Sequence, residues 1–362
     1  MSRTTTPGSS TTSASVAEAA HCDARGEHAK AIQLLSDAAR AGDTEAMTRL
    51  GKRLLLASAG ANRPEDGVAL LAGAARLGHA EAAAQLGVLS AVGMFVPQSW
   101  DDALTAVAFA AERGWLAARG QLRVLSADRE LAARADETAT TDLTVWRRLA
   151  ATIELDAWHR PATNGATLHE SPLIHHFREF VDPGVCNWLI EKARPRLVRA
   201  PIYSARAGRA TISDTRTNTW AMFDITVCDL VSVLVQVRIC ANTGAPFRNL
   251  EPLAVLHYAL GEEATEHFDF VDPLTDNYEH VLERQGERDL TFLVYLNEDY
   301  EGGETQMPQI GFSHKGRRGE GFYFVNVHEN GKPDRRTLHA GRPPKRGEKW
   351  VVSQFIRNRP TF

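Results

Sequence analysis

Hydrophobic and polar positions divide the chain into a helical first part and a strand-rich last part. Ala and Leu dominate from residue 18 to residue 130, where good helix formers stand on both sides of recurring Gly residues. Beyond residue 171 the pattern changes to short apolar runs separated by Gly, Asp, Asn and Pro, which is typical of strands and turns. These runs are LAVLHYAL, LTFLVYL, GFYFVNV and WVVSQFI. The pattern predicts a helical domain followed by an all-β core with flanking helices, built as a sandwich or jelly roll.

The helical part repeats itself every 36 residues. AARAGDTEAMTRLG and AARLGHAEAAAQLG match each other, and AAERGWLAARGQL occupies the same place in a third copy, which has Arg123 where the other two have Gly. The recurring positions are Gly42, Gly78 and Gly114, Ala46, Ala82 and Ala118, and Leu50, Leu86 and Leu122. We expect the first helix of a pair to end near Arg40 or Arg76, with the following Gly as a left-handed cap. The period is typical of a helix-turn-helix solenoid.

This segment resembles Sel1-like repeats, relatives of the tetratricopeptide repeat, which usually present a concave surface to a peptide or protein. The alternative is a helical cap that only stabilises the neighbouring domain. We expect four segments along the chain: a disordered tail rich in Ser and Thr over 1–17, the repeats over 18–130, a helical linker and loop over 131–170, and a second domain over 171–362.

Composition narrows the class of protein. The 362 residues are 43% hydrophobic and 24% charged, which excludes a wholly disordered, collagenous or membrane-embedded chain. A net charge of −4 and a pI near 6.4 give no reason to expect nucleic acid as a partner. Residues 1–15 lack the apolar core of a signal peptide, and no run approaches the ~18 apolar residues of a membrane span. With four widely spaced Cys, we expect a cytoplasmic protein with reduced thiols and no membrane partner.

The first candidate for chemistry is His267-Phe268-Asp269. Residues two apart on a strand point to the same face, so this imidazole and carboxylate would converge. His339 follows 70 residues after Asp269, and two His with one carboxylate form the facial triad of non-haem Fe(II) oxygenases. Lys349 then begins an apolar strand, where it would pair with the far carboxylate of a dicarboxylate bound to the metal. An isolated H-x-D motif more often belongs to a surface strand than to a metal site. The presence of His339 and Lys349 later in the chain favours the metal site here.

Residues 171–362 resemble the 2-oxoglutarate- and Fe(II)-dependent dioxygenases of the prolyl 4-hydroxylase type. The resemblance runs through SPLIHHFREFVDPGVCNWLIEKARPRL, RTNTWAMF, LAVLHYALGEEATEHFDF, RDLTFLVYLNEDYEGGETQMP and TLHAGRPPKRGEKWVVSQFIRNR, in family order and spacing. It implies a double-stranded β-helix, which is a jelly roll with the metal inside. It also implies Fe(II), the co-substrate 2-oxoglutarate, O2, and ascorbate as a candidate reductant.

The resemblance assigns roles residue by residue. His267, Asp269 and His339 would be both the iron ligands and the catalytic residues, and Lys349 would bind the C5 carboxylate of 2-oxoglutarate. Two further co-substrate positions and four positions of the peptide groove carry over as well: Tyr258 and Thr305 for 2-oxoglutarate, and Arg216, Asn218, Glu251 and Arg288 for the substrate. For the arginines the alternative is a solvated rim.

Two positions depart from the family on the substrate side. Ala264 stands where a Tyr is common, three residues before His267, and Phe355 stands where a Trp is common, six residues after Lys349. Both changes shrink a side chain near the iron, and both leave the iron and co-substrate positions intact. Room for a bulkier residue or an amino-acid-derived small molecule would follow.

The sequence therefore predicts an enzyme, a 2-oxoglutarate-dependent hydroxylase acting on a prolyl residue of a peptide or protein, with the repeats helping to recruit that substrate. The first alternative is a hydroxylase of a free amino acid or small natural product. The second, from another class, is a non-catalytic binding protein that uses the repeats.

Overall fold

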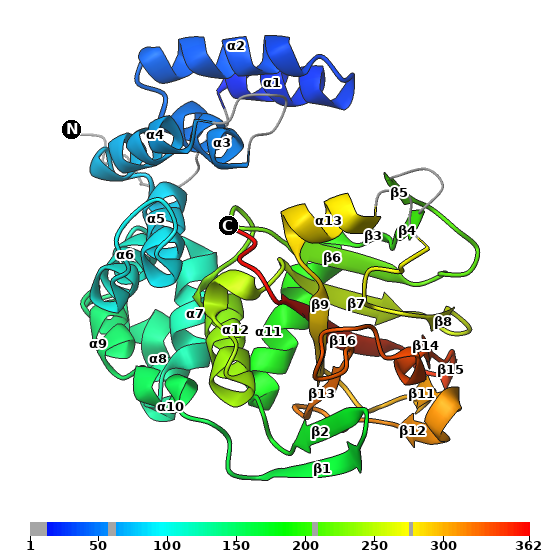
Figure 1. The fold of residues 1–362 in the computed structure, drawn as a ribbon. Coiled ribbons are helices and arrows are strands. Elements are labelled where there is room, and N and C mark those ends of the chain that lie inside the picture. The colour runs from blue at the N-terminus through cyan, green and yellow to red at the C-terminus, as the bar shows by residue number, and fades with distance from the viewer. Residues whose placement is uncertain (1–12, 57–62, 205–208, 275–277) are drawn as a thin grey trace, which may run out of the picture. The chain divides into compact units, whose positions relative to one another are not determined.

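The computed structural model describes residues 13–56, 63–204, 209–274 and 278–362 (Figure 1). The chain divides into two compact units, each described by itself. Unit 1 takes in the chain up to Glu154 together with Cys228–Val233, and unit 2 takes in Leu155–Val227 and Leu234–Phe362. Among the described residues, no helix combines the length and the apolar character needed to cross a membrane.

Unit 1 is built from helices. They are α1 (Ala14–Ala24), α2 (His28–Arg40), α3 (Thr44–Leu55), α4 (Pro64–Arg76), α5 (Ala80–Val92), α6 (Trp100–Glu112), α7 (Leu116–Leu125), α8 (Arg129–Thr138) and α9 (Val145–Ala151). The predicted helix ends at Arg40 and Arg76 are confirmed. Each of the three pairs α2–α3, α4–α5 and α6–α7 is one copy of the 36-residue period.

The turn inside each pair depends on glycine. Gly42, Gly78 and Gly114 have φ values of +90°, +93° and +85°, a region that an L side chain enters only with strain. In the first copy the N–H of Gly42 bonds to the carbonyl of Ala39, and the N–H of Asp43 bonds to that of Ala38. This is the Schellman pattern of a helix end, and the other two copies repeat it.

The expected tail over 1–17 needs a correction at its end. Residues 1–12 lie outside the described residues, but α1 already begins at Ala14. The Ser13 side chain caps the helix by accepting from the N–H of Val16, and Val16 is fully buried in a cluster with Ala19 and Leu35. Residues 14–17 therefore supply both a cap and apolar surface, which outweighs the cost of ordering them.

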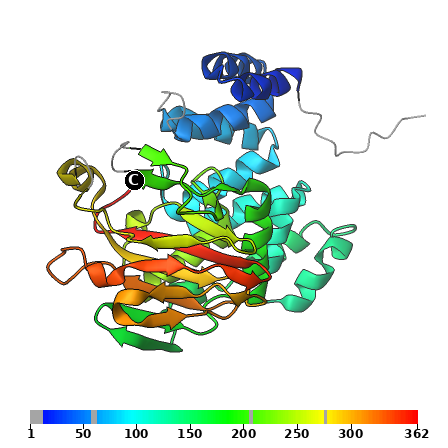
Figure 2. The same ribbon diagram turned by 90° about the vertical axis from the view of Figure 1, so that its right-hand side faces the viewer.

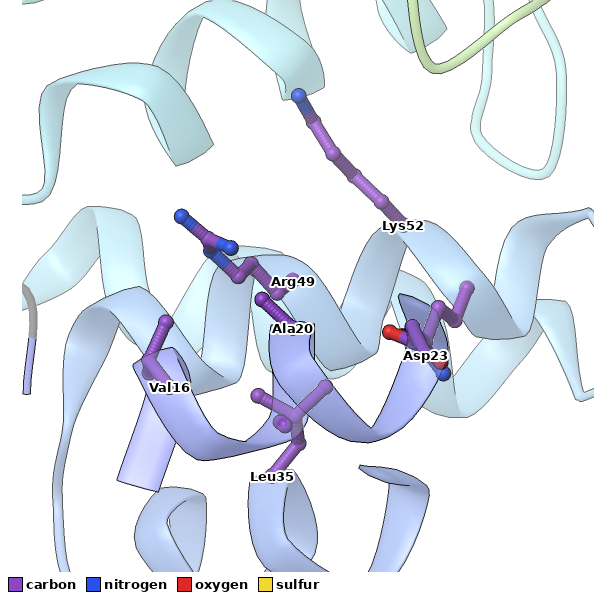
Figure 3. Close-up of a pocket in the computed structure, with 8 residues that line it drawn as sticks. Val16, Ala20, Asp23, Leu35, Arg49 and Lys52 are labelled. Carbon is purple, nitrogen blue, oxygen red and sulfur yellow. Dashed lines mark hydrogen bonds and ion pairs between the residues drawn. The ribbon is translucent and has the colours of Figure 1, made fainter. Parts of the chain in front are cut away.

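A hollow of about 230 Å³ opens between α1, α2 and α3 (Figure 3). Apolar side chains, among them Val16 and Leu35, line part of its wall. Its charged side chains Asp23, Arg49, Lys52 and Arg53 are tied down by ion pairs: Arg53 with Asp23, Lys52 with Glu81, and Arg49 with Glu45 at 2.6 Å. The hollow thus combines a partly apolar wall with charged side chains that are already held in ion pairs.

Unit 2 contains two main antiparallel sheets. The larger has eight strands in the order β1-β2-β13-β9-β16-β7-β6-β3, and the smaller has four in the order β12-β11-β14-β8. The strands of the larger sheet are β1 (Gly165–Glu170), β2 (Leu173–Phe177), β3 (Val198–Arg199), β6 (Thr219–Phe223), β7 (Leu253–Tyr258), β9 (Arg288–Tyr295), β13 (Gly321–Val325) and β16 (Lys349–Arg357). The smaller has β8 (Ala264–His267), β11 (Thr305–Met307), β12 (Phe312–His314) and β14 (His339–Gly341).

In the described part of unit 2, two short two-stranded ladders and four α-helices accompany the two main sheets. The ladders are β4 (Ile202–Ser204) with β5 (Arg209–Thr211), and β10 (Glu301–Gly302) with β15 (Pro344–Arg346). The helices are α10 (Leu155–His159), α11 (Pro183–Ala193), α12 (Leu230–Thr243) and α13 (Tyr278–Gln285). The part of α12 from Leu234 onward belongs to unit 2, and its start belongs to unit 1. Strand β1 and helix α10 fall in the segment 131–170 that was expected as a helical linker and loop. The end of that segment is a strand instead of a loop, because β1 pairs with β2 and extends the larger sheet.

One apolar cluster joins the two sheets. Leu293 and Tyr295 of β9 and Val351 of β16 meet Met307 of β11 and Ala264 of β8 there. Most of β9 and β16 is buried on both faces, and Figure 2 shows the red strand β16 within the body of the sheet. On the other side, Gln236 of α12 donates a hydrogen bond of 2.9 Å to Gln354 of β16. Helices on one face and strands on the other explain why most of these two strands is buried.

Close approach of helices in unit 1 predicts the effect of one methyl group. A Cβ added at Gly87 of α5 would lie 2.9 Å from the carbonyl oxygen of Ala103 on α6, which is backbone and has no room to yield. We expect Gly87→Ala to lower the free energy of unfolding by about 1–3 kcal/mol, measured by urea denaturation. Gly73→Ala is the matched control, because its Cβ would meet only the flexible end of Met47 and alanine favours the helix. Equal stability of the two variants would contradict close packing at Gly87.

Candidate metal centre

Two strands of the smaller sheet bring His267, Asp269 and His339 together. His267 ends β8, His339 begins β14, and the two are direct cross-strand partners with ring centroids 4.3 Å apart. Asp269 follows two residues after His267, and its Oδ1 lies 3.5 Å from Nε2 of His267 while its Oδ2 lies 3.4 Å from Nε2 of His339. One ligand atom from each residue falls within 4.8 Å of the others. Among the described residues this is the one such group of three.

Hydrogen bonds to the main chain orient both imidazoles. Nδ1 of His267 lies 2.8 Å from the carbonyl oxygen of Thr265, and Nδ1 of His339 lies 3.0 Å from that of Thr337. A carbonyl only accepts, so each Nδ1 carries the proton and each Nε2 keeps its lone pair. Both lone pairs face the carboxylate of Asp269. This donor set fits a divalent metal with open positions, since two neutral imidazoles and one carboxylate converge on a single point.

Electrostatics keep His267 and Asp269 in the forms that bind a metal. Burial and the neighbouring imidazole of His339 lower the pKa of His267 below its ordinary value, so the ring stays neutral. Burial alone would raise the pKa of Asp269, but the imidazoles of His339 and His267 and the hydroxyl of Thr291 hold it below its ordinary value. The carboxylate therefore stays ionised.

Lys349 is a buried cation without a counter-ion. It begins β16 directly opposite Tyr258 of β7, and only 2% of its surface is exposed. Its Nζ lies over the rings of Tyr258 and Tyr295, 5.2 Å and 5.6 Å from their centroids, and within the described part of the chain it makes neither an ion pair nor a hydrogen bond. Burial lowers the pKa of Lys349 to about 8, with Glu304 acting in the opposite direction. An anionic ligand would remove the cost of this isolated charge.

Tyr258 and Thr305 both lie in the same interior. Each is almost fully buried, Tyr258 on β7 and Thr305 on β11. The hydroxyl of Thr305 lies 3.0 Å from that of Tyr295, a residue that sequence reasoning did not single out. The signal that could have found Tyr295 is the alternation of β9, which places Leu293 and Tyr295 on the inner face.

The predicted substrate positions separate into two groups. Arg288 donates two hydrogen bonds to Glu251, of 2.6 Å and 2.9 Å, and its guanidinium lies 3.9 Å from the centroid of the Phe355 ring. Arg357, which sequence reasoning missed, donates a 2.6 Å hydrogen bond to the same Glu251. Arg288 is therefore held in a fixed network, and the alternative of a solvated rim does not describe it.

Arg216 and Asn218 form the second group. Nε of Arg216 donates to Oδ1 of Asn218 at 3.1 Å, and Asn218 is fully buried. No carboxylate pairs with Arg216 among the described residues. Ala264 is buried opposite Gly341 and forms a β-bridge with Arg216. Arg216 thus lies beside the strand that ends at the candidate metal ligand His267.

Known proteins of similar sequence identify the family of this chain. The sequence profile of the 2OG-Fe(II) oxygenase superfamily matches residues 253–357. Prolyl 4-hydroxylase 1 of Arabidopsis thaliana is 30% identical over 206 residues, which cover 53% of this chain and 71% of that protein. The chain belongs to the prolyl 4-hydroxylase family of 2-oxoglutarate- and Fe(II)-dependent oxygenases. As a member of this family, the oxygenase uses Fe(II), 2-oxoglutarate and O2.

Other relatives and solved structures each match only part of this oxygenase. Probable prolyl 4-hydroxylase 7 of Arabidopsis thaliana is 27% identical over 54% of this chain and 65% of its own length, and prolyl 4-hydroxylase subunit alpha-2 of Gallus gallus is 29% identical over 52% and 35%. Among solved structures, a viral collagen prolyl hydroxylase of Paramecium bursaria Chlorella virus-1 is 24% identical, with TM-score 0.40 and coverage of 51% and 95%. A Sel1 repeat protein of Oxalobacter formigenes is 18% identical, with TM-score 0.29 and coverage of 40% and 60%.

The environment of Lys349 predicts how pH changes binding of 2-oxoglutarate. The ammonium form is lost as the pH rises through about 8, and the attraction for a carboxylate is lost with it. We expect the Kd of the Co(II)-loaded protein for 2-oxoglutarate, measured by calorimetry, to stay constant from pH 6 to 7 and to rise by up to about tenfold between pH 8 and 9. Lys349→Met should bind weakly at every pH. If wild type and Lys349→Met gave the same pH profile, Lys349 would not be the carboxylate partner.

Proposed function

We propose that this oxygenase hydroxylates a prolyl residue of a peptide or protein. The observation that carries the proposal is the pairing of an oriented His-Asp-His group with a buried, unpaired lysine in one interior. His267, Asp269 and His339 would hold Fe(II), and Lys349 would hold the C5 carboxylate of 2-oxoglutarate. The names of the plant and animal relatives, which are prolyl 4-hydroxylases, support proline as the target.

Each residue of the candidate site would have a distinct role in the reaction. Bound Fe(II) and 2-oxoglutarate with O2 supply the oxidising chemistry, in which 2-oxoglutarate gives succinate and CO2 and one oxygen atom enters a C–H bond of the substrate. Nε2 of each ligand histidine presents a lone pair because its Nδ1–H is engaged. Tyr258 and Thr305 would donate hydroxyl hydrogen bonds to the same carboxylate as Lys349. Their burial excludes water, which strengthens each of these interactions.

The fixed arginine network supports a peptide groove. Glu251 accepts hydrogen bonds from both Arg288 and Arg357, and the guanidinium of Arg288 lies over the ring of Phe355. Arg216, whose charge no described carboxylate pairs, would donate to a carbonyl or carboxylate of the substrate. One face of the smaller Phe355 ring is therefore covered by a guanidinium and would not contact the substrate.

The proposal includes the finer architecture. The eight-stranded and four-stranded sheets that share one apolar cluster would form a double-stranded β-helix, or jelly roll, with the metal ligands on its smaller sheet. The three helix pairs with 36-residue spacing would form a Sel1-like solenoid.

A coupled assay tests the reaction. With Fe(II), 2-oxoglutarate and ascorbate, we expect succinate to form and proline-containing peptides to gain 16 Da by mass spectrometry. His267→Ala removes a ligand and should lower the rate by at least about a hundredfold. His328→Ala, which changes an exposed histidine outside the group of three, should keep the wild-type rate. Mass gain on a free amino acid but not on any peptide would replace the prolyl assignment with the small-molecule alternative. Absence of succinate in every assay would leave the non-catalytic alternative.

We also propose that the repeats recruit the protein substrate through the hollow between α1, α2 and α3. Its apolar wall would take an apolar side chain, while its cations would remain paired with their own acids. The hollow lies in unit 1 and the metal ligands lie in unit 2, so recruitment and chemistry would be separable.

Variants of one exposed alanine test recruitment. Ala20 lines the hollow on α1 and is exposed, so Ala20→Arg should block it without disturbing the core (Figure 3). We expect kcat/KM for a protein substrate to fall by about tenfold, which corresponds to roughly 1.4 kcal/mol of binding, while kcat/KM for a short peptide stays unchanged. Ala17→Arg is the matched control, since Ala17 is exposed on the same helix and does not line the hollow. An equal loss on both substrates, or none on the protein, would count against recruitment there.

A further inference from the structure

A buried threonine contacts the carboxylate of the metal centre. Thr291 lies in β9, in the middle of the larger sheet, between Phe324 of β13 and Phe355 of β16. Only 1% of its surface is exposed. Its hydroxyl donates a hydrogen bond of 2.8 Å to Oδ2 of Asp269, and both partners are buried. A bond to a charged acceptor in a dry site is strong and keeps its geometry.

Behind the threonine stands a buried asparagine. Nδ2 of Asn326 donates to Oγ1 of Thr291 at 3.0 Å, and Asn326 is fully buried just after β13. Its own backbone is held at both ends, because its N–H donates to the carbonyl of Asp289 at 2.7 Å and its carbonyl accepts from the N–H of Asp334 at 2.9 Å. Oδ1 of Asn326 has no hydrogen-bond partner in the described part of the chain. The amide therefore serves Thr291 rather than a network of its own.

The direction of this relay follows from its ends. An ionised carboxylate only accepts, so the single proton of the Thr291 hydroxyl points to Asp269. The lone pairs of the hydroxyl then face an amide N–H of Asn326, which cannot compete for that proton. The relay runs from Asn326 to Thr291 to Asp269 and cannot run backwards.

Distances alone leave both oxygens of Asp269 available to a metal. Oδ1 lies 3.5 Å from Nε2 of His267, and Oδ2 lies 3.4 Å from Nε2 of His339, so neither oxygen is favoured by position. We propose that Thr291 and Asn326 select between them. With Oδ2 engaged by Thr291, Asp269 binds the metal through Oδ1 alone. The proposal rests on the proposed function, in that it treats Asp269 as a metal ligand.

Selection of one oxygen matters because this chemistry needs open positions on the metal. A carboxylate that binds through both oxygens occupies one position more than a carboxylate that binds through one. That position would be lost to the co-substrate or to O2. Thr291 and Asn326 are thus positioning residues, which act on the metal only through Asp269.

Counting the water ligands of bound Mn(II) tests the relay without any turnover. Mn(II) at saturation relaxes water protons in proportion to the number of water molecules bound to it. We expect Thr291→Val, which removes the hydroxyl and keeps the shape, to lower this relaxivity by on the order of a third, because a two-oxygen Asp269 displaces one of about three waters. The Kd for 2-oxoglutarate in the same samples should rise by about tenfold.

Matched variants separate the relay from general damage. Thr291→Ser keeps the hydroxyl and should restore both readouts, and Thr48→Val, a buried threonine of α3 in unit 1, should leave both unchanged. Asn326→Leu should shift both readouts in the same direction by less, and should add nothing to Thr291→Val because the two residues act in series.

Two results would overturn the proposal. One is wild-type relaxivity in Thr291→Val at saturating Mn(II). The other is loss of Mn(II) binding in Thr291→Val with binding intact in Thr291→Ser, which would mean that the hydroxyl retains the carboxylate and does not select an oxygen. If wild type bound Mn(II) but not 2-oxoglutarate, the proposed function would fail, while the relaxivity of the metal-only samples would still decide the role of Thr291.

Discussion

The cross-strand pairing of His267 with His339 is the constraint on which the candidate site depends. These residues stand 72 positions apart in the chain, and the ladder between β8 and β14 places one imidazole directly against the other. A slip of one residue in that ladder would turn one ring to the opposite face of the sheet. The apolar cluster between the two sheets fixes the register, because Ala264 of β8 belongs to it. The packing that forms the core thus also brings the candidate metal ligands together.

The cationic side chains at this candidate site differ in whether an acid pairs with them. At the predicted substrate positions, Glu251 accepts hydrogen bonds from both Arg288 and Arg357, so two cations share one half-buried acid. At the predicted co-substrate position, Lys349 is buried against two tyrosine rings with no acid bonded to it among the described residues. An isolated buried charge lowers stability, and a ligand carboxylate would recover that loss. The fold therefore carries a cost in stability at Lys349 that an anionic ligand would remove.

Unit 1 follows a different rule, in which small residues allow close packing. Gly51 and Gly87 recur at the repeat spacing, and each faces a backbone carbonyl of the next helix at a distance that no side chain permits. The third copy has Arg123 at this position, where it pairs with Asp136 of α8 instead. Loss of the glycine thus coincides with a change in what the helix packs against, at the end of the repeats.

Local spacing in the sequence determined the helix ends at Arg40 and Arg76, the glycine turns, and the convergence of His267 with Asp269, because each depends on residues within a turn or on one strand. The same reasoning did not single out α12, whose run LVSVLVQVRICANT is mostly apolar in its first part and fits a buried helix or a buried strand equally. It also missed Tyr295, Thr291, Asn326 and Arg357, and it left open whether Arg288 is solvated. These roles arise from hydrogen bonds between strands and segments that are distant in the chain. Only the tertiary structure decided them, because the register of one strand against another is set by packing of the whole core and is not written in any single strand.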